Sequence, residues 1–85
     1  NSERRTIQRL TYHRMNDGSK QGVLLTINGT EAVKNVTLPR PNGVRGFELL
    51  WDSALELPPR PGLTMAAGAK LRMVETSMQL FAVQL

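Results

Sequence analysis

Residues 22–28 read Gly-Val-Leu-Leu-Thr-Ile-Asn, and this stretch decides the fold class. It is rich in β-branched and aliphatic side chains, which favour an extended strand over a helix. Successive residues of a strand point to opposite sides of a sheet, so Val23, Leu25 and Ile27 share one face. We therefore expect a strand here that packs these three side chains into a core.

Turn-forming residues lie on both sides of this strand. Asn16–Ser19 precede it, and Asn28–Glu31 follow it with an Asn-Gly pair that is typical of hairpins. A return strand is expected over residues 32–38, with Val36 and Leu38 pointing inward, before a proline- and glycine-rich segment ends it.

The rest of the chain repeats this pattern of short apolar stretches and turns. Residues 45–52 predict a strand on which Phe47, Leu49 and Trp51 share the core-facing side. The proline-rich segment 53–62 predicts a surface loop. Further strands are expected over residues 63–65, 70–74 and 77–85.

Residues 1–20 fit either a helix or a strand by spacing, and we expect an incoming strand or a linker there. Strands at intervals of about ten residues, joined mostly by turns, indicate an all-β fold. We expect one domain over residues 1–85, a small antiparallel β-sandwich of about six to eight strands.

The last strand is apolar on both sides. Met78, Leu80 and Ala82 alternate with a second apolar row that contains Phe81 and Val83. An isolated sandwich normally buries one face of each sheet, so a second apolar face needs a cover, which could be the first segment, the loop 53–62 or another domain. Leu24 and Leu50 also point opposite to their expected core-facing neighbours. If another domain is the cover, Leu24, Leu50, Phe81 and Val83 are the candidate interdomain contacts.

Composition argues against chemistry in this chain. Among 85 residues there are 11 Lys plus Arg, 7 Asp plus Glu, one histidine and no cysteine. We expect no catalytic residue, no metal site and no cofactor, because nucleophile, phosphate-binding and ligand motifs are missing. Glu48 and Asp52 could share one face as a carboxylate pair, but a turn cap explains Asp52 better. No apolar run is long enough to span a membrane.

Two binding functions remain as alternatives. Trp51 and Tyr12 could stack on sugar rings as an α-glucan-binding module, although core packing is the simpler role for Trp51. The net charge of +4 includes a cluster from Arg4 to Arg14 that could contact nucleic acid, but the other cations are scattered and nucleic acid is not the expected partner.

Four segments in order carry a family resemblance: residues 22–31, 36–39, 47–54 and 77–83. They comprise a strand that ends in Asn before an acidic turn, a strand that ends in Leu-Pro, a Leu-Trp-Asp-Ser-Ala strand end and a final Ser-x-x-Leu-Phe strand. This succession resembles the C-terminal domain of bacterial glycogen debranching enzymes, which are isoamylase-type glycoside hydrolases of the α-amylase superfamily. The resemblance covers roughly residues 21–85.

The resemblance implies a non-catalytic β-sandwich that follows a (β/α)₈ barrel in the same polypeptide, in the bacterial cytoplasm. The barrel would hydrolyse α-1,6 linkages of glycogen with its own carboxylates, none of which falls on this chain. The barrel would also cover the second apolar face. Because the chain starts at Asn1 without an initiator Met or signal peptide, we expect it to be part of a longer polypeptide.

Overall fold

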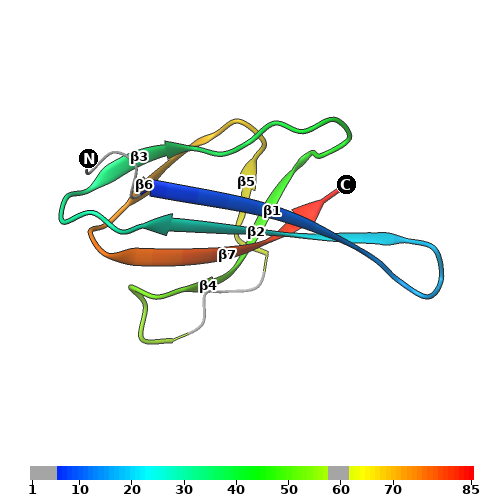
Figure 1. Ribbon diagram of the computed structural model, residues 1–85, viewed down its shortest axis with the longest axis horizontal. Helices are drawn as coiled ribbons and strands as arrows, with labels where there is room; N and C mark the ends of the chain where they lie inside the picture. The colour runs from blue at the N-terminus through cyan, green and yellow to red at the C-terminus, as the bar shows by residue number, and fades with distance from the viewer. Residues whose placement is uncertain (1–5, 58–61) are drawn as a thin grey trace.

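The computed structural model describes residues 6–57 and 62–85, so the expected loop segment Pro58–Pro61 lies outside the described residues. The described chain forms seven strands (Figure 1), and all of its strand pairings are antiparallel. The strands are β1 (Thr6–Arg14), β2 (Lys20–Asn28), β3 (Lys34–Thr37), β4 (Gly46–Asp52), β5 (Thr64–Ala66), β6 (Lys70–Met73) and β7 (Ser77–Gln84).

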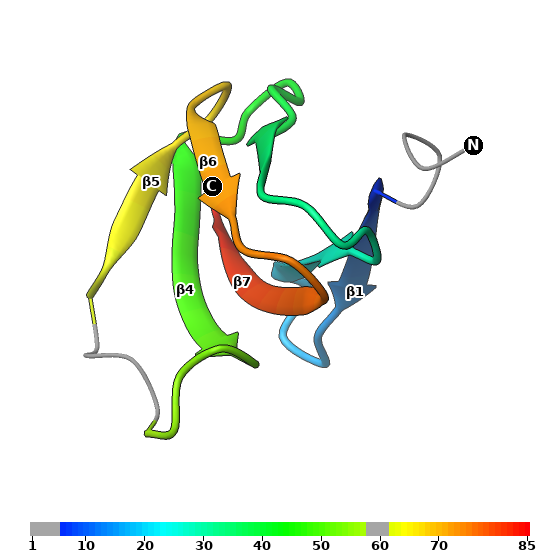
Figure 2. The same ribbon diagram turned by 90° about the vertical axis from the view of Figure 1, so that its left-hand side faces the viewer.

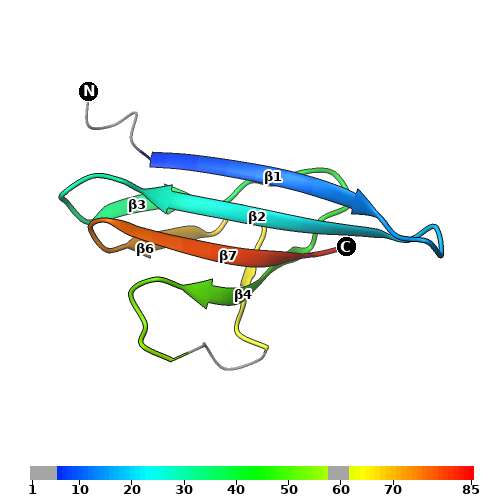
Figure 3. The ribbon, with the colours of Figure 1, turned by 60° about the horizontal axis from the view of Figure 1, so that its bottom comes forward.

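The strands form two sheets of unequal size. The larger sheet has the order β1-β2-β7-β4-β5, and the smaller pairs β3 with β6. Figure 2 shows the small sheet facing the concave side of the large one, and Figure 3 shows β1, β2, β7 and β4 side by side. This arrangement confirms the predicted small all-β sandwich. We call the side of the large sheet that faces β3 and β6 the inner face, and the opposite side the outer face.

The first segment is a strand, and it forms a hairpin with β2. The β1–β2 turn is closed by hydrogen bonds from the Met15 N–H to the Ser19 carbonyl at 2.8 Å and from the Gly18 N–H to the Met15 carbonyl at 3.0 Å. Gly18 has a φ of 87°, a conformation that suits glycine. The tip of this hairpin extends beyond the two-layer body (Figure 1).

The expected hairpin between residues 22–28 and 32–38 is wrong. β2 pairs with β1 and β7, whereas β3 belongs to the second sheet and pairs with β6. The connection between β2 and β3 crosses from one layer to the other, because the buried Asn28 side chain donates to the carbonyls of Ala32 at 2.9 Å and Val74 at 3.0 Å. Side-chain hydrogen bonds of this kind redirect the chain out of the ladder.

The core lies between the inner face and the small sheet. Its buried cluster consists of Leu24, Leu38, Val44, Phe47, Leu49 and Phe81. Phe47 and Phe81 contact each other edge to face, with ring centroids 6.2 Å apart. Val36 and Met73 are also buried, as the alternation of their strands predicts.

The expected orientation of β2 is wrong by one residue. Leu24 is fully buried, whereas Val23 is 41% exposed and Leu25 and Ile27 are half-buried. The reason is the pairing of β2 with β7, which places Leu24 beside Phe81 on the inner face. Because a strand alternates at every residue, this pairing turns Val23, Leu25 and Ile27 to the outer face.

The expected orientation of Trp51 is also wrong. Phe47 and Leu49 point into the core, but the β4–β7 register shifts between Leu49 and Trp51, which leaves Leu50 as an extra residue. An extra residue reverses the alternation beyond it. Trp51 therefore lies on the outer face opposite Leu80, and it is 43% exposed.

Candidate functional site

The outer face of the large sheet carries a group of apolar side chains. The registers between strands place side chains of β1, β2, β7 and β4 next to one another on this side. Ile7 is 51% exposed, and Val23, Leu50 and Trp51 are each more than 40% exposed. The apolar side chains of the outer face are Ile7, Val23, Leu25, Ile27, Leu50, Trp51, Met78, Leu80 and Ala82, and the polar side chains of Arg9, Thr11, His13, Gln21 and Glu48 share this side. No other described segment is layered over it in Figures 2 and 3.

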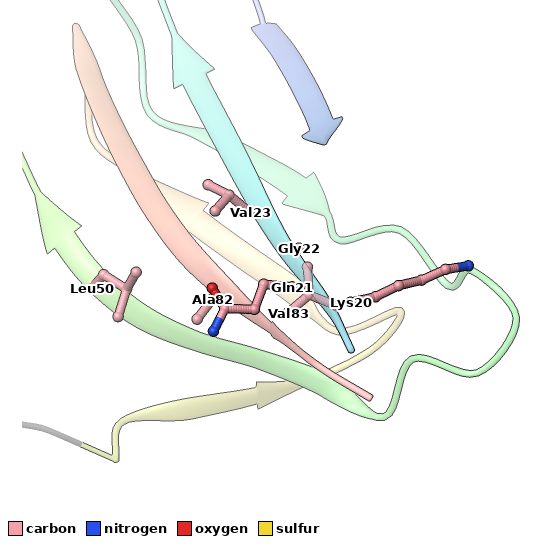
Figure 4. Close-up of a pocket in the computed structure, with 7 residues that line it drawn as sticks. All are labelled: Lys20, Gln21, Gly22, Val23, Leu50, Ala82 and Val83. Atoms are coloured by element: carbon pink, nitrogen blue, oxygen red, sulfur yellow. The ribbon is translucent and has the colours of Figure 1, made fainter. Parts of the chain in front are cut away.

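A shallow hollow of about 240 Å³ lies in this surface (Figure 4). Its centre is the small side chain of Ala82 on β7, and Val23 and Leu50 stand on the flanking strands. The amide of Gln21 lies at the hollow and can both donate and accept a hydrogen bond. Because Lys20 also lines the hollow beside these apolar side chains, the hollow can receive a protruding side chain that has both apolar and polar atoms.

Of the four predicted interdomain contacts, two are wrong. Leu24 is fully buried and Phe81 is 1% exposed, and both belong to the core cluster, so neither can touch a second domain. Val83 is half-buried beside Phe47 on the inner face, although it reaches the rim of the hollow. Leu50 is 44% exposed on the outer face, as expected of a contact residue.

The predicted sugar-stacking pair is not brought together. Trp51 lies on the outer face of β4, whereas Tyr12 pairs with Gly22 on the inner face of β1. Both rings are 43% exposed, but β2 and β7 separate their strands. A single ligand therefore cannot stack on both.

The two carboxylates considered as a catalytic pair, Glu48 and Asp52, each accept local hydrogen bonds. Glu48 lies on the outer face and accepts from the Gly62 N–H at 3.1 Å. Asp52 lies beyond the bulge, opposite Gln79, and accepts from the Ala54 N–H at 2.8 Å and the Gln79 amide at 2.6 Å. They are on opposite faces, so they do not form a catalytic pair, and the Asp52 contact is the turn cap that the sequence indicates.

Other titratable groups are spread over the surface. Arg9 and His13 point to the outer face of β1 and Arg14 to the inner face, while Arg4 and Arg5 lie outside the described residues. Among residues 6–57 and 62–85, no three His, Cys, Asp or Glu side chains are grouped so that they could hold a metal ion. The same residues contain no helix with the length and hydropathy needed to cross a bilayer.

The sequence predicts that the large sheet has apolar side chains on both faces. It does not predict most of the residues that lie on the outer face. The doubly apolar strand β7 was the signal, and its two rows are as predicted, with Met78, Leu80 and Ala82 on one side. Alternation does not show which of the two sets of β7 side chains faces the small sheet. Strand pairing decides that, and alternation within one strand does not.

Comparisons with protein-family models, with curated proteins and with solved structures find no match to this chain.

Proposed function

We propose that this chain is a non-catalytic accessory domain that docks on a neighbouring domain through its outer face. The observation that carries the proposal is the group of exposed apolar side chains on this face, above all Ile7, Val23, Leu50 and Trp51. A contiguous apolar surface of this kind is typical of an interaction site. Burial of about 300 Å² of apolar area would contribute about 7 kcal/mol to the docking of the two domains, before the entropy cost of ordering the interface.

The resemblance of residues 21–85 to the last domain of bacterial glycogen debranching enzymes suggests the neighbour. It would be a catalytic (β/α)₈ barrel in the same cytoplasmic polypeptide, and this barrel would hydrolyse α-1,6 linkages of glycogen. The role of the sandwich would be to raise the stability of the whole enzyme. Reading the coding sequence upstream of Asn1 tests the identity of the neighbour directly. A barrel with amylase-type carboxylates supports this identity, and any other neighbour contradicts it.

Paired substitutions test the docking surface itself. Val23→Ser with Leu50→Ser is expected to lower the unfolding free energy of the 85-residue chain by only about 1–2 kcal/mol, because both side chains are more than 40% exposed. In the complete polypeptide the same pair is expected to lower the melting temperature and to speed proteolytic release of this domain. The matched control is Leu57→Ser, which removes a side chain that is 78% exposed outside the outer face.

Equal behaviour of the paired variant and the control in the complete polypeptide would contradict docking through the outer face. Loss of folding in the isolated chain would show instead that the two residues stabilise the sandwich itself.

The exposure of Trp51 favours α-glucan binding as a second candidate function. One ring of a glucan could stack on the indole, but Tyr12 cannot contribute because it lies on the opposite face. Titration with maltooligosaccharides, followed by the fluorescence of this lone tryptophan, tests the idea. A saturable fluorescence change in the unchanged chain, together with loss of binding in Trp51→Ala measured by calorimetry, supports it. Absence of binding to the unchanged chain in calorimetry rejects it.

A further inference from the structure

The free edge of β1 is the longest unpaired strand edge of the large sheet. β1 pairs with β2 at nine consecutive positions from Thr6 to Arg14 without a bulge, and no described strand pairs with its other edge. The Gln8 side chain donates to the Thr37 carbonyl of β3 at 2.8 Å, which leaves the backbone groups of this edge unpaired by any described strand. The opposite edge of the sheet is β5, with three residues. Proteins usually shorten, bulge or cover such edges, because their free N–H and C=O groups can pair with another strand.

The charges on β1 indicate which partner it suits. Residues 6–14 contain Arg9, His13 and Arg14 and no acidic residue. The neighbour of Arg9 on β2 is Leu25, and the neighbour of Arg14 is Lys20, so neither arginine faces a carboxylate across the hairpin. A second copy of β1 would bring further cations to this edge, whereas a strand with carboxylates would neutralise them.

The two arginines also point to opposite sides of the sheet. Arg9 shares the outer face with Leu25, and Arg14 is on the inner side because it is five residues further along the strand. A ligand lying on one face of the sheet could reach one of them but not both. A strand added in the plane of the sheet places side chains on both faces and so reaches both.

We propose that the β1 edge binds an extended acidic segment of a partner protein, which adds an antiparallel strand to the large sheet. Its backbone pairs with the free edge of β1, and its carboxylates lie opposite Arg9 and Arg14. This interaction uses the edge of the sheet and is independent of docking through the outer face.

A short peptide tests the proposal on the 85-residue chain. The probe is acetyl-Glu-Thr-Val-Thr-Val-Glu-Thr-Val-amide, whose two Glu face Arg14 and Arg9 when it pairs antiparallel with β1. Its binding is expected to shift the NMR signals of β1 and to slow hydrogen exchange at alternate β1 amides. A peptide with Lys at both Glu positions is expected to bind at least about tenfold more weakly.

Charge reversal in the protein tests the pairing. The variant with Arg9→Glu and Arg14→Glu is expected to lose affinity for the acidic peptide by about tenfold or more and to gain it for the Lys peptide. The control variant carries Lys70→Glu and Arg72→Glu on the exposed side of β6 and has the same net charge. It is expected to bind the acidic peptide within about twofold of the unchanged chain.

Backbone pairing is tested with two N-methylated versions of the acidic peptide, each blocked along one edge. One version is expected to bind and the other to fail, since a strand pairs with β1 through one edge. Binding of both versions, or equal binding of the acidic and Lys peptides, would overturn the proposal. So would a concentration-dependent dimer whose contact maps to β1, because a second copy would then occupy the edge, or displacement of the peptide by a single-stranded oligonucleotide.

Discussion

Asn28 on β2 forms hydrogen bonds from the large sheet to the end of β6 in the small sheet. Its fully buried side chain donates to the carbonyls of Ala32, Met73 and Val74, and its Oδ1 accepts from the Thr30 N–H at 3.1 Å and the Thr30 hydroxyl at 2.6 Å. Asn28→Ala removes these hydrogen bonds and takes the Oδ1 acceptor from the Thr30 N–H, whereas the carbonyls of Ala32 and Val74 keep the hydroxyls of Thr30 and Ser77. We therefore expect the free energy of unfolding to fall by about 1–3 kcal/mol. Urea denaturation measures this loss.

Asn35→Ala is the matched control for that prediction. Asn35 is exposed on β3, and its replacement is expected to change stability by at most about 0.5 kcal/mol. Equal losses in the two variants would contradict the assigned role of the buried amide.

Asp17 in the β1–β2 turn provides a pH-dependent contact. Its Oδ1 accepts from the Ser19 hydroxyl at 2.6 Å and from the Ser19 N–H at 2.9 Å, and these hydrogen bonds lower the pKa of Asp17 from its ordinary value of 3.8. Because the folded pKa is below the unfolded one, the contact stabilises the turn above the ordinary pKa and is lost as the pH falls through the folded value.

Ser19→Ala removes the largest cause of this shift and is expected to raise the pKa of Asp17 towards 3.8. A carboxyl ¹³C NMR titration of Asp17 measures the change. Ser53→Ala, remote from this turn, should leave the titration curve in place. An unchanged curve in Ser19→Ala would show that its hydroxyl does not control the ionisation.

At the scale of elements, the sequence predicts which segments form strands. It does not predict which side of each strand faces the core. The segments around residues 22–28, 45–52 and 77–85 form strands because their local composition favours them. The bulge at Leu50 depends on the pairing of β4 with β7, which no local pattern shows, and it turned Trp51 outward. The excess of apolar faces was therefore predictable, whereas the membership of the outer face required the registers.

The β4–β5 pairing depends on a glycine at its first position. Gly46 pairs with Ala66, and a Cβ added at Gly46 would lie 2.5 Å from the backbone oxygen of Met65. Because a backbone atom must move, Gly46→Ala is expected to destabilise the chain by about 1–3 kcal/mol and to increase hydrogen exchange in β5. Gly22→Ala is the comparison, since its Cβ would meet the side chains of Val83 and Tyr12.

The contacts at Gly22 are longer, 2.8 Å to Val83 Cγ2 and 2.9 Å to Val83 Cβ, so Gly22→Ala is expected to cost less than Gly46→Ala. Thermal unfolding of both variants gives the order of their stabilities. The reverse order would contradict the close backbone contact between β4 and β5.

At the scale of the whole molecule, one core holds both sheets. A two-stranded sheet such as β3–β6 is not stable alone in water. Leu38, which follows β3, is buried in the same cluster as Phe47 and Phe81 of the large sheet. We therefore expect the two layers to unfold together, with loss of the core removing both.

Phe81 on β7 and Trp51 on β4 contribute unequally to stability, because only Phe81 lies in this shared core. Phe81 is 1% exposed in the core, so Phe81→Ala is expected to cost about 3–5 kcal/mol. A chain of 85 residues has a total stability of about 4–13 kcal/mol, so this loss brings the domain close to unfolding. Trp51 is 43% exposed on the outer face, and Trp51→Ala is expected to cost about 1 kcal/mol.

Urea denaturation followed by circular dichroism measures both variants without relying on tryptophan fluorescence. In Phe81→Ala, hydrogen exchange should accelerate in β2 and β6 alike, because these strands belong to different sheets but depend on the same core. In Trp51→Ala both should keep their protection. A large loss in Trp51→Ala with a small loss in Phe81→Ala would mean that the chain buries the opposite face of β4 and β7, and the apolar outer face would then lose these residues as a docking surface.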